Sequence, residues 1–274
     1  MDYLEPCCCF DSSQYTGLPD AEPCPQEIGV PKLIAQLDAL YNAGREDEAG
    51  EFLQRWRGEA KRLGDWRGEL SMLSELMGHT RRSRDRELGL EAVNAGLDII
   101  REHRMGGTVS GATVLLNAAT TMKAFGLARE SLPIFEHVSR VYGQHLDPND
   151  YRFGGLYNNM GLTLTALGRF AEANALYDRA MEQMAAVPGG ALEMAITCLN
   201  RADTAAAERG AEDAETEIAA LLDRGWTLLH APDVPRNGYC AFVYEKCAPT
   251  FSYYGRFADA ADLRAEAEEL YERT

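Results

Sequence analysis

Apolar residues recur along this chain at intervals of three and four positions, which is the spacing of one face of an α-helix. One such run is Leu156, Met160, Leu164 and Leu167, where each apolar residue lies within about one turn of the next. Long runs of β-branched residues are few, and this also favours helix over strand. The pattern therefore predicts helices along most of the chain.

Prolines mark the expected breaks between helices, because proline cannot continue a helix. Those placed between apolar runs are Pro148, Pro188, Pro232 and Pro235. Two others, Pro133 and Pro249, fall inside apolar runs. We expect these two to lie in the first turns of helices or at a kink.

The chain repeats itself with a period of about 42 residues. Asn159 follows Asn117 by 42 positions, and Gly168 follows Gly126 by the same interval. Residues 254–270 (YGRFADAADLRAEAEEL) also match residues 167–183 (LGRFAEANALYDRAMEQ). A fixed period of this length is typical of stacked supersecondary units. We expect six units, with starts near residues 30, 70, 112, 154, 195 and 241.

Each expected unit has one residue near its middle that suits a tight turn. These residues are Gly44, Arg84, Gly126, Gly168, Gly210 and Gly255. Glycine adopts positive φ without strain, so each unit is expected to fold as a helix, a turn and a second helix. The prediction is an all-α fold with six antiparallel helix pairs over residues 30–274. Residues 1–29 would form an extended or partly disordered segment.

The fourth unit carries the clearest consensus pattern. Its positions are Tyr157, Met160, Gly161, Leu164, Gly168, Ala173, Tyr177 and Ala180. This pattern resembles the tetratricopeptide repeat (TPR). The 42-residue spacing and the Asn-Asn-Met-Gly start are similar to the long repeats of kinesin light chain and of bacterial peptide-sensing regulators. The resemblance covers roughly residues 30–274 and implies a right-handed superhelical solenoid whose first helices line a concave groove.

A row of asparagines is expected along this groove. Asn117, Asn159 and Asn200 occupy the same position in three successive units, two residues before a small residue of the first helix. A carboxamide offers one acceptor and two donors, so it could pair with the main chain of an extended peptide. The resemblance implies this role, because related long-repeat families bind ligand backbone at this position. The alternative is that these side chains bond to a neighbouring helix or face water.

Other residues of the first helices are candidates to line the same groove, although each could equally be packed or solvated. They are Asn158, Thr120, Lys123, Leu162, Thr165, Asp203, Glu75, Arg81, Arg82 and Lys246. Ile34 and Asp38 stand where the family's clamp for a peptide C-terminus requires lysine and asparagine, so that specificity is not expected. The arginine run 81–86 could capture a phosphate or an acidic peptide. Alternatively, it is a solvated loop that Asp85 and Glu87 partly neutralise.

Cysteine and histidine patterns give little support to metal or catalytic chemistry. Cys7, Cys8, Cys9 and Cys24 could offer thiolates to zinc, but no C-x-x-C pair is present. We expect Cys198, Cys240 and Cys247 to be small buried hydrophobes instead. The five histidines form no H-E-x-x-H pattern, and no G-x-S-x-G or phosphate-binding glycine loop is present. The prediction is a protein that is not an enzyme and that has no metal site and no cofactor.

Charge narrows the range of partners. The formal net charge of −16 argues against non-specific binding to nucleic acid or to an anionic membrane. No apolar run approaches the roughly 18–20 residues of a membrane span, and no secretory signal is seen, so we expect a cytoplasmic protein. Residues 1–29 carry six acidic residues and no lysine or arginine, whereas the six first-helix windows sum to +1.

Two function classes remain from the sequence. The first is a protein-interaction module that binds an extended peptide or partner segment through the asparagine row. The second is a structural or self-assembling protein, such as a homo-oligomer, whose groove is filled by its own or a neighbour's N-terminal segment. A regulatory role through a protein partner also stays open, but 29 residues are too few for a separate DNA-binding domain.

Overall fold

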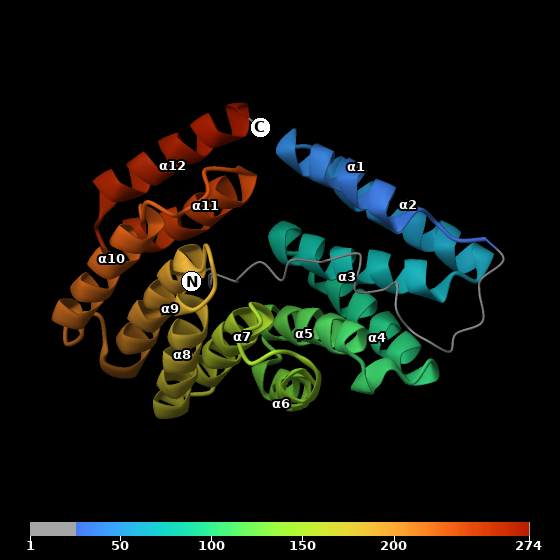
Figure 1. Cartoon of the computed structure of the whole chain (residues 1–274), viewed down its shortest axis with the longest axis horizontal. Helices are drawn as coiled ribbons and strands as arrows, with labels where there is room; N and C mark the ends of the chain where they lie inside the picture. Colours follow the sequence, from blue (N-terminus) through green and yellow to red (C-terminus); the bar gives the residue numbers. More distant parts are fainter. Residues whose placement is uncertain (1–25, 274) are drawn as a thin grey trace. The chain divides into compact units, whose positions relative to one another are not determined.

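The computed structural model describes residues 26–273, and within this range the chain is helical without strands. Twelve α-helices and one short 3₁₀ helix follow one another in this part of the chain (Figure 1). They form two compact units, residues 26–146 and residues 147–273, which we describe separately. The expected all-α repeat architecture is therefore confirmed.

The unit 26–146 contains three helix pairs. They are α1 (Val30–Asn42) with α2 (Glu46–Leu63), α3 (Trp66–Ser83) with α4 (Arg86–Glu102), and α5 (Val109–Ala124) with α6 (Ala128–His145). The 3₁₀ helix η2 (Met105–Gly107) connects the second pair to the third. In this unit α1, α3 and α5 are the first helices of their pairs.

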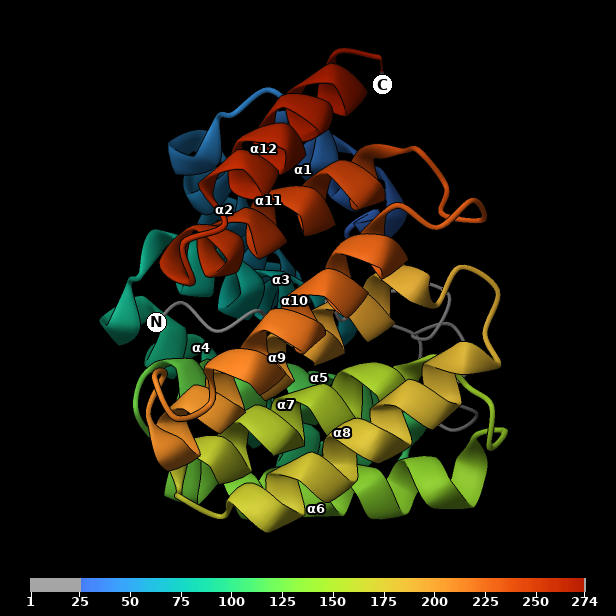
Figure 2. The ribbon, with the colours of Figure 1, turned by 90° about the vertical axis from the view of Figure 1, so that its left-hand side faces the viewer.

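The unit 147–273 also contains three pairs, stacked in chain order (Figure 2). They are α7 (Arg152–Ala166) with α8 (Phe170–Ala185), α9 (Ala191–Arg209) with α10 (Glu215–Leu229), and α11 (Gly238–Tyr253) with α12 (Phe257–Glu272). Each first helix packs against its own second helix, and α9 also contacts both α7 and α11. None of the helices described in residues 26–273 has the length and apolar character needed to cross a lipid bilayer.

A residue with positive φ joins the two helices of every pair. The turn residues are Gly44, Arg84, Gly126, Gly168, Gly210 and Gly255, with φ between 59° and 88°. These are the six residues expected from the repeat, so the predicted turns are confirmed. Arg84 is the one residue of the six that is not glycine. At φ 59° it adopts the left-handed conformation, which is unfavourable for residues with a Cβ atom.

The two internal prolines lie deeper in their helices than expected. Pro133 is the sixth residue of α6 and Pro249 is the twelfth residue of α11. The expectation of a first-turn position is wrong for both. A proline at these positions removes one intrahelical hydrogen bond, and packing of the surrounding helix must compensate for that loss.

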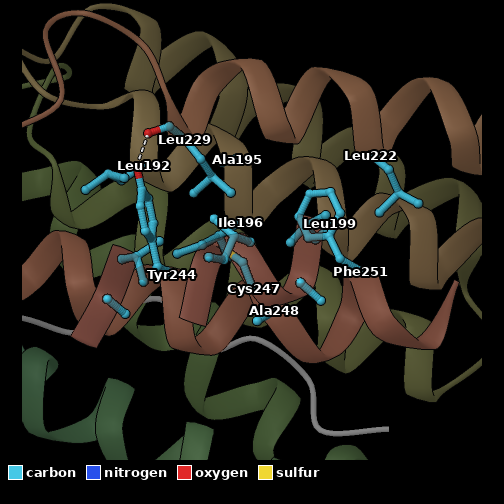
Figure 3. Close-up of a cluster of buried hydrophobic side chains, with 14 of the residues drawn as sticks. Leu192, Ala195, Ile196, Leu199, Leu222, Leu229, Tyr244, Cys247, Ala248 and Phe251 are labelled. Carbon is cyan, nitrogen blue, oxygen red and sulfur yellow. Dashed lines mark hydrogen bonds between the residues drawn. The ribbon is translucent and has the colours of Figure 1, made fainter. Parts of the chain in front are cut away.

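The core of the unit 147–273 lies where α9, α10 and α11 meet (Figure 3). Leu192, Ile196 and Leu199 of α9 pack there with Tyr244 and Phe251 of α11, and all five are at most 1% exposed. The Tyr244 hydroxyl donates a hydrogen bond of 2.8 Å to the carbonyl oxygen of Leu229 at the end of α10. A buried hydroxyl needs such a partner, so this bond fixes α10 against α11.

A close approach between α7 and α8 depends on Gly161. A Cβ placed on this residue would lie 2.4 Å from the ring of Tyr177, which is fully buried in α8. Gly161→Ala should therefore force two backbones apart and lower the free energy of unfolding by about 1–3 kcal/mol. Urea unfolding followed by circular dichroism measures this change.

Gly143 supplies the matched control for this substitution. It lies in α6, is exposed, and has no atom within 4 Å of the position of an added Cβ. Gly143→Ala should raise the free energy of unfolding by about 0.5–1 kcal/mol, because alanine loses less backbone entropy on folding. Equal effects of the two substitutions would contradict the close packing assigned to Gly161.

Candidate protein-interaction surface

Buried polar side chains join the first helices of the unit 147–273. The Asn200 side chain on α9 donates a 3.1 Å hydrogen bond to Oδ1 of Asn158 on α7. The Asn158 amide in turn donates to Oγ1 of Thr197 on α9, at 2.9 Å. All three residues are fully buried. These bonds set how α7 and α9 lie against each other, and we call them the polar ladder.

Hydroxyl groups extend this ladder toward the other end of the two helices. The hydroxyls of Thr165 on α7 and Thr204 on α9 lie 2.8 Å apart. Both lie 3.4 Å from the hydroxyl of Tyr177, which reaches them from α8. Thr165 is thus a bridging residue between helices rather than an open surface residue.

A comparable set of bonds joins α3 and α5 in the unit 26–146. The Asn117 amide donates to Oγ of Ser74 at 2.8 Å. Arg81 donates from Nη1 to Oγ1 of Thr121 at 2.9 Å. Asn117 is 5% exposed, so it too is held between helices.

The three asparagines of the predicted row share one unusual feature. The Oδ1 atoms of Asn117, Asn159 and Asn200 are buried, and no donor among the described residues pairs with them. The Asn159 amide group donates only to the Gly155 carbonyl of its own helix, at 3.0 Å. An unpaired buried acceptor costs about 1–3 kcal/mol. Three such acceptors at one repeat position are therefore candidates to accept hydrogen bonds from a ligand.

Two carboxyl groups on α9 are held by tyrosines from the last helix pair. Tyr254 donates its hydroxyl to Asp203 at 2.8 Å, and Tyr239 donates to Glu193. Burial raises the pKa of Asp203 to about 6 and the pKa of Glu193 to about 7, although each tyrosine hydrogen bond partly opposes the shift. Both carboxyl groups thus join α9 to the third helix pair.

An apolar stripe runs along one side of α11 in this unit. Tyr239, Phe242, Lys246, Pro249 and Tyr253 are spaced by three or four residues and lie on one side of α11. Tyr253 is 62% exposed, Pro249 is exposed, and the other three are half-buried. The opposite side of α11 forms the core shown in Figure 3. We call this set of five residues the α11 stripe.

The stripe carries one positive charge over an aromatic surface. The ammonium group of Lys246 lies 5.6 Å from the ring centroid of Phe242. The rings of Tyr239 and Phe242 are stacked with centroids 6.4 Å apart. Aromatic rings combined with a cation can contact both apolar side chains and the polar main chain of a partner.

The basic run predicted at residues 81–86 has several structural roles. Arg82 lies with its guanidinium 4.6 Å from the ring centroid of Tyr41 on α1. Asp85 caps the N-terminus of α4 by accepting a 3.0 Å hydrogen bond from the Leu88 amide. Beside them, the pKa of Glu75 is raised to about 7, mainly by burial and then by the nearby charge of Asp38. Arg82 remains exposed, and Arg81 and Glu75 are half-buried.

The remaining predicted residues are mostly buried. Thr120 donates to the Leu116 carbonyl of its own helix at 2.8 Å. Leu162 is 1% exposed and Lys123 is 7% exposed. Cys198, Cys240 and Cys247 are buried free thiols, as expected, whereas Cys7, Cys8, Cys9 and Cys24 lie outside the described residues. Among the described residues, no group of three or more histidine, cysteine or acidic side chains could hold a metal ion.

Comparison with solved structures identifies the fold. A crystal structure of nearly identical TPR-like repeats from Podosopora anserina, named for kinesin light chain, matches with a TM-score of 0.50 and 13% sequence identity. The match covers 74% of this chain and 95% of that chain. The fold of this protein is TPR-like. BtubC from P. vanneervenii is also found, with a TM-score of 0.42, 13% identity, and coverage of 90% of this chain and 92% of the other. No protein-family model and no curated protein matches the sequence.

The TPR-like repeat explains why the sequence indicated Lys246 but not its neighbours on the α11 stripe. The repeat comparison selects one position per first helix, and in α11 that position is Lys246. Tyr239, Phe242 and Tyr253 follow the same helical spacing as core residues, because α11 is apolar on nearly all sides. That all-round apolar character is the signal that could have revealed a second, exposed apolar face.

Asn158 and Asn159 are neighbours in the TPR-like sequence but have different structural roles. Asn158→Ala breaks two bonds of the polar ladder and leaves the Asn200 amide unpaired, so it should lower the free energy of unfolding by about 1–3 kcal/mol. Asn159→Ala removes only a bond to its own helix and an unpaired acceptor, and its effect should be at most about half as large. Urea unfolding of both variants measures the difference. Equal losses would contradict the ladder.

The buried carboxyl groups predict a pH dependence of stability. Their folded-state pKa values lie above the ordinary values of 3.8 and 4.5, so the folded protein binds more protons than the unfolded chain between about pH 4 and pH 7. The free energy of unfolding should therefore fall as pH rises through this window. The double variant Asp203→Asn with Glu193→Gln keeps the acceptor oxygens but cannot ionise, and should show a smaller loss between pH 5 and pH 8.

Urea unfolding at both pH values measures this effect. Glu182→Gln, which changes an exposed carboxyl of α8, serves as the control and should follow the wild type. A double variant with the same pH dependence as the wild type would show that Asp203 and Glu193 are not the responsible groups.

Proposed function

We propose that this protein is a non-catalytic interaction module that binds an extended segment of a partner protein along its first helices. The α11 stripe is the observation that carries this proposal. It is an apolar and aromatic face on a first helix whose opposite side already belongs to the core. Tyr253 is exposed, and Tyr239 and Phe242 are partly exposed; aromatic residues of this kind supply large contact areas in protein-binding surfaces.

The asparagine row supports the same proposal and adds recognition of the partner's main chain. Each of the three Oδ1 acceptors could receive a hydrogen bond from a main-chain N–H, which would make binding tolerant of partner sequence. Because these side chains are at least 95% buried, a peptide reaches them only if the surrounding chain opens. We therefore assign the first contact to the stripe, and we assign Asn159 and Asn200 of the same unit to the part of the partner segment that follows.

The nearly neutral first-helix windows also support apolar and main-chain recognition over capture of a strongly charged partner. We further place the protein in the cytoplasm. The free thiols of Cys198, Cys240 and Cys247 suit a reducing compartment.

A peptide-display selection tests the proposal even though the partner is unidentified. The folded chain is used to select from a random library of extended peptides, and dissociation constants of enriched peptides are measured by fluorescence anisotropy. The double variant Phe242→Ala with Tyr253→Ala should bind these peptides at least about tenfold more weakly, because it removes two aromatic contacts.

Two further variants give this experiment its controls. Tyr151→Ala removes an aromatic residue that is 42% exposed and lies outside the stripe, so binding should change less than twofold. Asn159→Ala should weaken binding while leaving helical content unchanged. The proposal fails if no peptide is enriched, or if the stripe variant binds as tightly as the wild type.

A second candidate function is supported by the burial of α7. All ten residues from Leu156 to Thr165 are buried, so this stretch of α7 has no solvent-facing side. We propose as the alternative that the acidic segment 1–29 of the same or a neighbouring chain acts as the ligand of the first helices, so that the protein mainly self-associates. In that case a chain lacking residues 1–25 should bind selected peptides more tightly or change its oligomeric state. Unchanged binding and unchanged mass in light scattering would exclude the alternative.

A further inference from the structure

A pocket of about 290 Å³ opens between α8, α9 and α10 of the unit 147–273. It is lined by Met181, Cys198, Arg201, Glu217, Leu221 and Arg224. Two of these helices, α8 and α10, are second helices of their pairs. None of the pocket residues belongs to the α11 stripe or to the polar ladder, so the pocket is a separate feature of this unit.

The inner part of the pocket is apolar. Cys198 is 1% exposed and Met181 is 8% exposed, and Leu221 on α10 adds a half-buried aliphatic wall. Burial raises the pKa of the Cys198 thiol, so this residue stays neutral. A ligand in the pocket would rest its apolar atoms on these three side chains.

Two guanidinium groups stand around this apolar base. Arg201 uses Nη1 to hold Asp178 at 2.6 Å, but its Nε is buried and has no hydrogen-bond partner among the described residues. Arg224 is exposed and forms no ion pair within residues 26–273. Both arginines line the pocket together with Cys198, so their positive charge lies at the pocket.

The charges around the pocket leave one positive charge in excess. Asp178 compensates Arg201, and Glu217 is paired with Arg209 of α9. Arg224 alone is uncompensated by a described residue. A monoanion would balance this charge, whereas a dianion would leave one negative charge in excess and would be repelled more strongly by Asp178 and Glu217.

We propose that this pocket binds a small organic monocarboxylate with a short apolar body. The carboxylate would accept hydrogen bonds from the accessible N–H groups of the Arg201 and Arg224 guanidinium groups, and the apolar body would lie on Met181 and Leu221. Guanidinium groups match planar carboxylates because their N–H donors form a fixed fork.

Butyrate is a suitable probe, and butyramide is its neutral counterpart of the same shape. With methyl-¹³C-labelled methionine, the signal of Met181 reports on the pocket directly in NMR titrations at constant ionic strength. Butyrate should shift this signal in a saturable manner, and butyramide should not. Inorganic phosphate should bind more weakly than butyrate.

Substitutions then locate the binding site. Arg224→Gln removes the uncompensated charge from an exposed position and should raise the butyrate dissociation constant at least about tenfold. Arg273→Gln changes an arginine of α12 whose side chain is 71% exposed, and it should change the constant less than twofold. Circular dichroism confirms that both variants are folded.

Three results would overturn the proposal. One is an equal response of the Met181 signal to butyrate and butyramide, which would indicate apolar binding without the carboxylate. Another is unchanged butyrate binding by Arg224→Gln. The third is tighter binding of phosphate than of butyrate, which would assign the pocket to a dianion. None of these results bears on the α11 stripe, so this proposal and the proposed function fail independently.

Discussion

The requirement that buried polar groups be hydrogen-bonded governs how the first helices pack in this protein. In the unit 147–273, the contact between α7 and α9 contains buried asparagines and threonines as well as apolar residues. The hydrogen bonds of Asn200 with Asn158, and of Thr165 with Thr204, form in only one relative position of the two helices. A sliding of one helix turn would leave several buried polar atoms unpaired. Apolar packing supplies the stability, and the polar ladder supplies the register.

The fold was predictable because its main signals are local. A turn that requires positive φ selects glycine at five of six positions, and the spacing of those glycines reveals the repeat directly. The helix starts were less well predicted, since the repeat marks buried positions rather than helix ends. Asp65, Thr108 and Asn237 accept hydrogen bonds from the first turns of α3, α5 and α11. These caps begin their helices three or four residues before the expected unit starts.

The candidate surface was predictable only in part, because helical spacing gives the direction of a side chain but not what lies opposite it. Asn158 and Asn159 illustrate the difference. Successive residues of a helix point about 100° apart, so one enters the polar ladder while the other bonds only to its own helix. The α11 stripe was missed for a related reason. Tyr239 and Phe242 have the composition of core residues, and only the packed structure distinguishes the buried side of an all-apolar helix from the exposed one.

The helix α9 connects surfaces of different chemistry. Thr197 and Asn200 face α7, whereas Cys198 and Arg201 line the pocket beside α10, about a quarter turn away. Tyr239 and Tyr254 hold the same helix from the following pair through Glu193 and Asp203. Coupling between two surfaces requires an element with two arrangements that both ligands influence. Because α9 is fixed by hydrogen bonds to α7 and to the third pair, a ligand in the pocket could affect the first-helix surface only by breaking the polar ladder. Ionisation of the two carboxyl groups as pH rises to about 7 therefore adds a desolvation cost to the packing of α9 against the third pair, while the tyrosine hydrogen bonds partly offset that cost.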